Sequence, residues 1–265
     1  MSAWRNTSGR PLSSNEWLQT HHNAKLPERT RFAKTIASKN PKRIVDLGCG
    51  PAIWLDLLDK YLPNDCEFFG IDSDSSSLVV AREKAQDWGR QSTFIALNID
   101  QQPEQIPQAD LYLAFNIFPY IKNTALLLET LSKKLPPDGL VFVRQYDGGM
   151  LRIGPLPQVN RSEINNALQS ATIKSEQFKH YDMDRVFEII SRSPLFSASI
   201  SFETYSRIAP FDEPTERYIR GTIEWEKSLV SENARKILEN WEQNQLGLAP
   251  AYFIGIDLVA ELSLQ

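Results

Sequence analysis

Short apolar runs alternate with stretches of helical spacing along most of this chain. The runs are rich in Val, Ile, Leu and Phe, as is typical of strands buried in a sheet. Between them, apolar residues recur every three or four positions, as on one face of a helix. This alternation predicts an α/β protein with a largely parallel sheet. The predicted strands lie within residues 43–47, 66–72, 93–100, 109–116, 140–147, 197–205 and 252–260, and the helices between them within 51–61, 77–88, 123–135 and 184–191.

Three stretches fall outside this alternation. Residues 1–40 are a polar lead-in followed by two helical patterns, and we expect an N-terminal helical lid on a domain that spans residues 41–265. Residues 150–183 and 211–247 interrupt the strand pattern and are predicted to form cap insertions at the edge of the sheet. The two helical patterns within 211–247 fit a second cap or a homodimer contact, and the sequence leaves both open.

Composition narrows the class of partner. The 265 residues carry a net charge of −4, which argues against the clustered basic surface of nucleic-acid-binding proteins and favours a small-molecule substrate. Cys49 and Cys66 are too few for a disulfide framework and lack metal-ligand spacing with histidine, so no metal is expected. We find no signal peptide or membrane-length apolar run and therefore expect a cytoplasmic protein.

The first strand ends in a glycine turn that leads into a helix. Glycine tolerates positive φ angles and close approach of a ligand, so Gly48 and Gly50 suit a nucleotide-type cofactor, and Pro51 suits the first helical position. A dinucleotide site would carry a third glycine where this chain has Ile53. Instead, Asp46 precedes the turn and brings a negative charge that attracts a cation.

The pattern of Asp46, Gly48 and Gly50 resembles the first motif of the class I S-adenosylmethionine-dependent methyltransferases. The resemblance implies a doubly wound, mainly parallel, Rossmann-like sheet of seven strands, with the last strand inserted antiparallel between the fifth and sixth. It implies S-adenosylmethionine as the cofactor, with Asp46 at its amino-acid end and the turn, including Cys49, making room for it. Ala52 stands where many members of that family carry a further glycine.

The end of the second strand supplies the next expected cofactor ligands. Asp72 lies about twenty residues beyond the turn, where doubly wound folds place a carboxylate on the ribose hydroxyls, and Ser73 follows it. The alternative role for Asp72 is a helix N-cap, although Asp74 and Ser75 suit that role as well.

The resemblance also assigns the ends of the third and fourth strands. It places the adenine beside the third strand, where Asn98 with its neighbour Ile99 matches best and Asp100 competes, unless these residues only form a polar turn. It places Asn116, at the end of the fourth strand, beside the transferred methyl group.

Residues beyond the fourth and fifth strands are candidate substrate contacts. Phe118 and Tyr120 are expected to form an apolar wall, with core packing as the alternative. Base-methylating members of the family often carry a compact Asn-Pro-Pro-Tyr run here, and this chain does not, which disfavours base methylation. Arg144, Tyr146 and Asp147 are the other candidates, and a structural ion pair is the alternative role for Arg144.

The chain has three histidines, and each is a candidate general base. His21 and His22 lie in the predicted lid, and His180 lies in the first predicted cap. Solvated surface histidines are the alternative for all three. A base is needed only if the methyl acceptor loses a proton during transfer.

The sequence thus favours methyl transfer from S-adenosylmethionine to an oxygen, nitrogen or carbon atom of a small molecule. Methylation of a macromolecule such as RNA or protein and non-catalytic cofactor binding remain alternatives, and a dehydrogenase fits least well.

Overall fold

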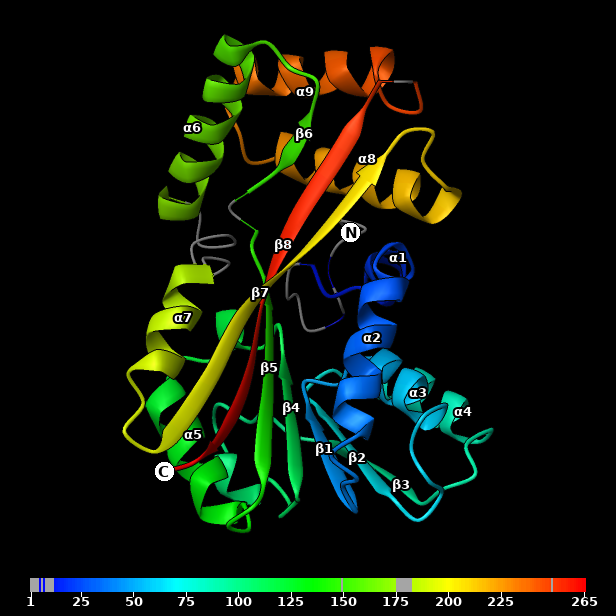
Figure 1. Ribbon diagram of the computed structural model, residues 1–265, viewed down its shortest axis with the longest axis vertical. Helices are drawn as coiled ribbons and strands as arrows, with labels where there is room; N and C mark the ends of the chain where they lie inside the picture. The colour runs from blue at the N-terminus through cyan, green and yellow to red at the C-terminus, as the bar shows by residue number, and fades with distance from the viewer. Residues whose placement is uncertain (1–4, 6, 8–11, 149, 175–182, 249) are drawn as a thin grey trace.

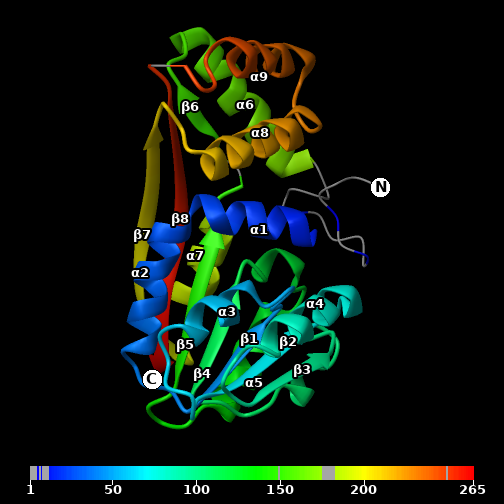
Figure 2. The same cartoon turned by 90° about the vertical axis from the view of Figure 1, so that its right-hand side faces the viewer.

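One mixed sheet extends from the bottom of the molecule into a helical cap at the top (Figures 1 and 2). The computed structural model describes residues 5, 7, 12–148, 150–174, 183–248 and 250–265. The strands are β1 (Arg43–Leu47), β2 (Glu67–Asp72), β3 (Ser92–Ala96), β4 (Leu111–Phe115), β5 (Leu140–Tyr146), β6 (Arg152–Gly154), β7 (Phe196–Ile208) and β8 (Tyr252–Leu264).

The strand order is β3-β2-β1-β4-β5-β8, and β7 pairs with the other edge of β8. β1 to β5 are parallel to their neighbours, whereas β8 runs antiparallel to both β5 and β7. The predicted α/β fold and the position of the last strand are therefore confirmed.

The described sheet has eight strands rather than the expected seven. β8 extends beyond the point where Asp257 pairs with Tyr146 at the end of β5. The edge of β8 would carry unpaired backbone groups there, and the short strand β6 pairs with it, from Arg152 opposite Ile254 to Gly154 opposite Tyr252.

Helices cover both faces of the lower sheet. α2, α3 and α4 lie on one face and α5 and α7 on the other, whereas α6, α8 and α9 form the cap (Figure 1). Among the described helices, none has the length and apolar composition of a membrane span. The bounds are α1 (Asn15–Ala24), α2 (Leu26–Ala37), α3 (Ile53–Asp59), α4 (Ser75–Ala85), α5 (Thr124–Lys134), α6 (Gln158–Lys174), α7 (Met183–Ser191), α8 (Glu213–Lys227) and α9 (Glu232–Asn244).

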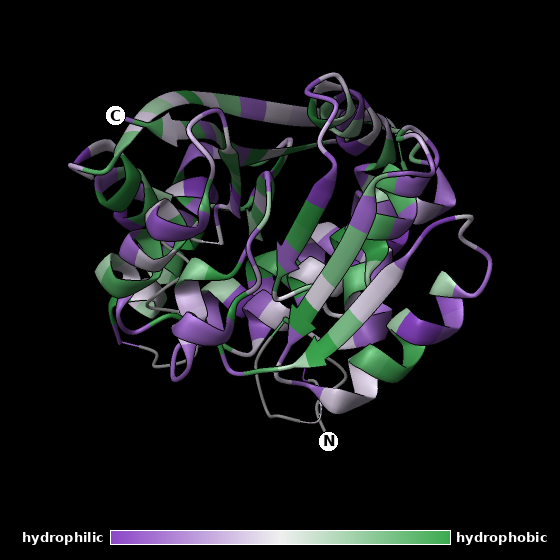
Figure 3. Cartoon of the chain, turned by 90° about the horizontal axis from the view of Figure 1, so that it is seen from below, coloured by the Kyte–Doolittle hydropathy of each residue, from purple (hydrophilic) through white to green (hydrophobic). Residues whose placement is uncertain are grey.

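β1 illustrates why the central strands are apolar throughout. Val45 belongs to a buried cluster with Leu127 of α5 and Val186 of α7, whereas Ile44 packs in another with Phe32 of α2 and Leu55 of α3. Both faces of the strand are thus removed from water, which explains a continuous apolar run rather than an alternating one. Seen from below, several strands carry apolar stretches, and the helices carry both apolar and polar residues (Figure 3).

A third apolar cluster fills the cap and reaches down to α1. It joins Trp17 of α1 to Ile219 of α8, Leu238 and Trp241 of α9, and Phe253 of β8. Figure 2 shows α1 lying between the sheet and the cap. Side chains of α1 therefore face the carboxyl ends of the parallel strands, where ligands bind in open α/β sheets.

Candidate functional site

A cavity lies at the carboxyl ends of the strands, and its lining includes the glycine turn, α1 and the cap. In the turn, Gly48 has φ +71° and Gly50 has φ +52°, angles that favour glycine. A Cβ on Gly48 would lie 2.7 Å from the Cγ2 of Ile117. Both space and backbone conformation therefore require glycine at this position.

The helix after the turn begins later than the sequence suggested. Pro51 was expected as the first helical residue, but α3 begins at Ile53. Its N-cap is Ala52, in the left-handed conformation with φ 55°. The residue that replaces the family's further glycine thus occupies a conformation that glycine adopts more readily.

Asp72 is held at the cavity by two backbone hydrogen bonds. Its Oδ2 accepts from the backbone N–H of Gly50 at 2.8 Å, and its Oδ1 accepts from that of Asp74, also at 2.8 Å. The helix N-cap is Asp74, which accepts from the N–H of Ser77 at 3.0 Å, so the alternative role for Asp72 is wrong. Ser73 and Cys49 also line the cavity.

Asp46 lies outside the cavity lining. Its side chain is buried, and its pKa is raised well above the usual value by burial and, secondarily, by the charge of Asp72. Asp46 therefore lies close enough to the turn to act on it electrostatically, and its role at the cofactor's amino-acid end stays a prediction.

The third strand end offers an apolar surface rather than a polar one. Ile99 lines the cavity together with Leu97, as expected for an adenine contact. Asn98 does not line it, because its Oδ1 accepts from the N–H of Asp100 at 3.1 Å. Asp100 in turn accepts from the N–H of Lys122 at 2.8 Å. These two polar side chains stabilise the turn, which is the alternative that the sequence left open.

Asn116 connects the ends of β4 and β5. It has φ 55°, its N–H donates to the carbonyl of Arg144 at 2.8 Å, and its Oδ1 accepts from the N–H of Tyr146 at 2.8 Å. Asn116 and Tyr120 line the cavity, but Phe118 does not. Phe118 is buried in the core on the α5 side, so core packing accounts for it.

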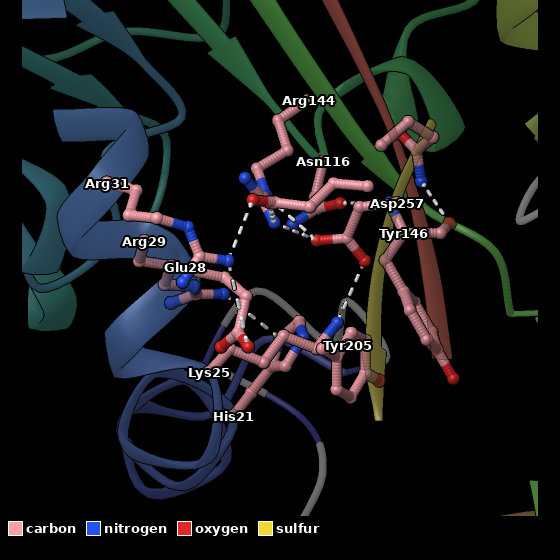
Figure 4. A network of polar contacts seen from close by, with 12 residues as sticks. His21, Lys25, Glu28, Arg29, Arg31, Asn116, Arg144, Tyr146, Tyr205 and Asp257 are labelled. Atoms are coloured by element: carbon pink, nitrogen blue, oxygen red, sulfur yellow. Dashed lines mark hydrogen bonds and ion pairs between the residues drawn. The ribbon is translucent and has the colours of Figure 1, made fainter. Parts of the chain in front are cut away.

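Arg144 is part of a buried ion-pair network instead of the cavity wall (Figure 4). Its Nε donates to Asp257 at 2.8 Å, and a terminal nitrogen donates to Glu203 at 2.6 Å. The Nζ of Lys25 donates to the other oxygen of Asp257 at 2.8 Å. The substrate role predicted for Arg144 is therefore replaced by the structural alternative. Asp147 also lies outside the lining.

Opposing effects set the pKa values in this network. Burial alone would raise the pKa of Asp257, but Lys25 and Arg144 hold it below its usual value. Burial lowers the pKa of Lys25, and Asp257 opposes that shift.

Four ring side chains, three of them in contact with His21, form part of the cavity wall. The imidazole of His21 is stacked on the ring of Tyr218, with centroids 5.2 Å apart and planes 9° apart, and Trp17 stacks on it at 6.2 Å. The ring of Tyr146 meets His21 edge-on at 5.6 Å. All four residues line the cavity, and the substrate contact expected for Tyr146 stays a prediction.

The three histidines that were candidate bases differ in where they lie. His21 lines the cavity, whereas His22 is buried outside the lining and has a pKa lowered to about 2, chiefly by burial and then by Arg29. Neither is the solvated surface residue of the alternative interpretation. His180 lies outside the described residues.

Arg29 is a cavity residue that we did not predict. Among the described residues, it is the only lysine or arginine in the lining. It is 4% exposed, and its guanidinium lies 5.0 Å from the ring centroid of Trp54. The spacing of residues in α2 explains this burial. Phe32, Ala33 and Ile36 follow Arg29 by three, four and seven residues and therefore share its face of the helix. A charged residue on such an apolar face is a signal for a site.

In the described part of the chain, Arg29 donates its hydrogen bonds to histidine nitrogens, and its positive charge can still pair with an anionic ligand. These bonds go to the Nδ1 atoms of His22 at 2.9 Å and His21 at 3.4 Å. Its Nε has no partner among the described residues. Because the two histidines are uncharged acceptors, a ligand carboxylate would complement this buried cation. No group of three or more potential metal ligands occurs among the described residues.

A family model and the sequences of known proteins both indicate a methyltransferase. Residues 45–141 match the model of a methyltransferase domain. The trans-aconitate 2-methyltransferase of Afipia carboxidovorans is 28% identical over 168 residues, which are 58% of this chain and 62% of that protein. Its namesake in Methylobacterium nodulans is 30% identical over 137 residues, half of each chain. The chain thus aligns with less than two thirds of either relative.

Among solved structures, the YcgJ protein of Bacillus subtilis has a TM-score of 0.55 at 13% identity, with 90% of this chain and 99% of that chain covered. This likeness supports the fold alone. Together with the matched domain and the glycine turn beside Asp72, it leads to one conclusion. The matched domain, the turn and the Rossmann-like fold support the class I family of S-adenosylmethionine-dependent methyltransferases that the glycine motif resembles.

Proposed function

We propose that this protein transfers the methyl group of S-adenosylmethionine to a small molecule bound between the sheet and the cap. The observation that supports this most is the continuity of one cavity. Its lining joins the glycine turn and Asp72 to Trp17, Tyr146 and Tyr218. Donor and acceptor would share this space, and their alignment would supply much of the catalysis.

The cofactor half of the cavity fits the chemistry of S-adenosylmethionine. Asp72 would bind the ribose hydroxyls, because the Gly50 and Asp74 N–H bonds orient its carboxylate at the cavity wall. Ile99 would contact the adenine ring. Arg29 would bind the carboxylate of the cofactor's amino-acid end, and the buried Asp46 would act on its ammonium group.

The acceptor half fits a small molecule. α1 crosses between the sheet and the cap, and the buried side chains of Trp17 and His21 line the cavity there. The relatives are named for trans-aconitate, a small organic acid, which makes that acid the first acceptor to test.

Calorimetric titration with S-adenosylmethionine, S-adenosylhomocysteine and NADH tests the cofactor. We expect saturable binding of the first two and none of NADH. Asp72→Ala should weaken that binding, and Asp65→Ala should not, because the Asp65 side chain is 63% exposed and pairs with Lys42 outside the cavity. Binding of NADH alone would overturn the proposal.

Transfer of a labelled methyl group to a panel of small acids, alcohols, phenols and amines tests the reaction. Tight binding of the cofactor without transfer to any of them would leave a non-catalytic cofactor-binding protein.

A further inference from the structure

His21 lines the cavity and carries a buried nitrogen without a hydrogen-bond partner among the described residues. The residue is 6% exposed and lines the cavity. Its Nε2 is buried and has no hydrogen-bond partner among the described residues. A buried polar atom without a partner costs about 1–3 kcal/mol, so this nitrogen points to a ligand atom that completes its hydrogen bonding.

The contact with Arg29 determines what this nitrogen can do. Arginine is only a hydrogen-bond donor, so the contact of 3.4 Å between its NH2 group and the Nδ1 of His21 requires a lone pair on Nδ1. Burial, then Lys25, Arg29 and Arg144, hold the pKa of the imidazole well below its usual value, so the ring is neutral. A neutral imidazole with a lone pair on Nδ1 carries its proton on Nε2. The unpartnered Nε2 is therefore a donor and not a base.

The charges around His21 favour an anion. Lys25, Arg29 and Arg144 all act on its ring, and Figure 4 shows the three cations close to it. Asp257 and Glu203 are the carboxylates that pair with Lys25 and Arg144. Glu203, 23% exposed, also pairs with Arg31 at 3.7 Å, and Arg31 and Arg207 share Glu28. The cations of this network therefore outnumber its carboxylates even when Arg29 binds the carboxylate of the cofactor. Of these cations, only Arg29 belongs to the cavity lining among the described residues.

Other titratable side chains at this end of the cavity do not supply a base. Burial raises the pKa of Tyr146 and that of Tyr218 well above the usual value of a phenol, so both phenols keep their protons at neutral pH. The carboxylate of Asp72 lies at the glycine turn, where both of its oxygens accept backbone N–H groups.

We propose that the acceptor binds as a carboxylate and that the Nε2–H of His21 donates a hydrogen bond to its oxygen. This inference rests on the proposed methyl transfer and names the class of its acceptor. An oxygen of the carboxylate forms the new bond to the methyl carbon, and the electron pair of the broken carbon–sulfur bond stays on sulfur. The product is a methyl ester, and no proton has to be removed. His21 thus orients the nucleophile, and the site selects acids over alcohols and amines, which must lose a proton.

Two substitutions separate a donor from a base. His21→Gln keeps an N–H donor and cannot act as a base, whereas His21→Phe keeps a ring and loses the donor. With trans-aconitate as the probe, we expect His21→Phe to lower kcat/KM about 10- to 100-fold, the effect of one hydrogen bond to a charged group. His21→Gln should stay within about threefold to tenfold of the wild type. A general base would make both variants equally poor, and that result would overturn the inference.

Binding measurements keep this test independent of turnover. Trans-aconitate should bind to the protein saturated with S-adenosylhomocysteine, its neutral trimethyl ester should not, and His21→Phe should weaken binding of the acid. His22→Gln is the matched control, because His22 also accepts from Arg29 but lies outside the cavity lining. It should leave acid binding within about twofold of the wild type. Acid binding that does not respond to His21→Phe would overturn the inference.

The tautomer can be observed directly. ¹⁵N NMR of the labelled protein should show a lone-pair nitrogen at Nδ1 of His21 and a protonated Nε2 at neutral pH, with assignment from the His21→Gln spectrum. A proton on Nδ1 would overturn the inference. Transfer to alcohols but not acids would also overturn it while leaving methyl transfer intact, and absent cofactor binding would instead remove the proposed function.

Discussion

Asp257 of β8 is the side chain whose neutralisation should destabilise this protein most. It is 2% exposed and accepts two charged hydrogen bonds, from Lys25 Nζ and from Arg144 Nε, both at 2.8 Å, and it forms an ion pair of 2.7 Å with a terminal nitrogen of Arg144. The bonds connect β8 to β5 and to the junction of α1 and α2. Asp257→Asn keeps the shape of the side chain and removes its charge.

The stability lost in Asp257→Asn depends on which buried charges lose their partner. In Asp257→Asn, Arg144 keeps Glu203, but Lys25 loses its carboxylate partner while its side chain is 0% exposed. Removal of one partner from a buried ion pair costs about 3–5 kcal/mol. Lys25→Met should cost less than about 2 kcal/mol, because Asp257 keeps Arg144 and an apolar chain suits the ring of Tyr205, 3.9 Å from the Nζ.

Urea unfolding monitored by tryptophan fluorescence measures both losses. The control is Glu261→Gln, the same chemical change on the same strand, where the pair with Lys39 is 2.7 Å long and about one-third exposed. We expect this control to change stability by less than about 1 kcal/mol. If Asp257→Asn cost no more than Glu261→Gln, or if Lys25→Met cost more than Asp257→Asn, our account of the network would be refuted.

Three further predictions concern the lid and the cofactor site. His22 has a folded pKa of about 2, below its unfolded value of about 6.5, so the unfolded state binds more protons and stability falls as the pH drops below about 6.5. Between pH 7 and pH 5 this loss is about 2 kcal/mol, and His22→Gln should remove it from the pH dependence of urea unfolding. Gly48→Ala should lower stability by about 1–3 kcal/mol in thermal unfolding, because its φ is +71° and its new methyl would meet Ile117; an unchanged melting temperature would contradict this. Arg29→Met should weaken S-adenosylhomocysteine binding about 10-fold or more in calorimetry by removing the cation at its carboxylate, and equal affinity would remove that role.

The order of elements could be predicted because it depends on local patterns. Each buried parallel strand needs apolar residues on both faces, and each helix needs one apolar face, so periodicity reveals both. Helix caps are equally local: Asp74 accepts from the N–H of Ser77 only three residues away. The eighth strand was missed because β6 is three residues long and exists only where β8 offers it an edge.

The candidate site could be predicted where a strand end alone determines position. Asp72, Ile99 and Asn116 line the cavity because each ends or follows a parallel strand. Asn98 and Arg144 lie in equally suitable places in the sequence, yet hydrogen bonds to Asp100 and Asp257 direct their side chains elsewhere. Those partners depend on how the chain packs, and local spacing carries no trace of them.

The sequence by itself predicted the family, the cofactor end of the site and the order of strands, because glycine conformation, strand burial and the spacing of acidic residues act over short stretches of chain. Tertiary structure alone decided the acceptor end. It brought His21 of α1, Arg29 of α2 and Tyr218 of α8 together at one cavity, and it gave His21 its tautomer through Arg29. The sum of buried charges and their distances sets the chemistry of that end, and neither exists before the chain has folded.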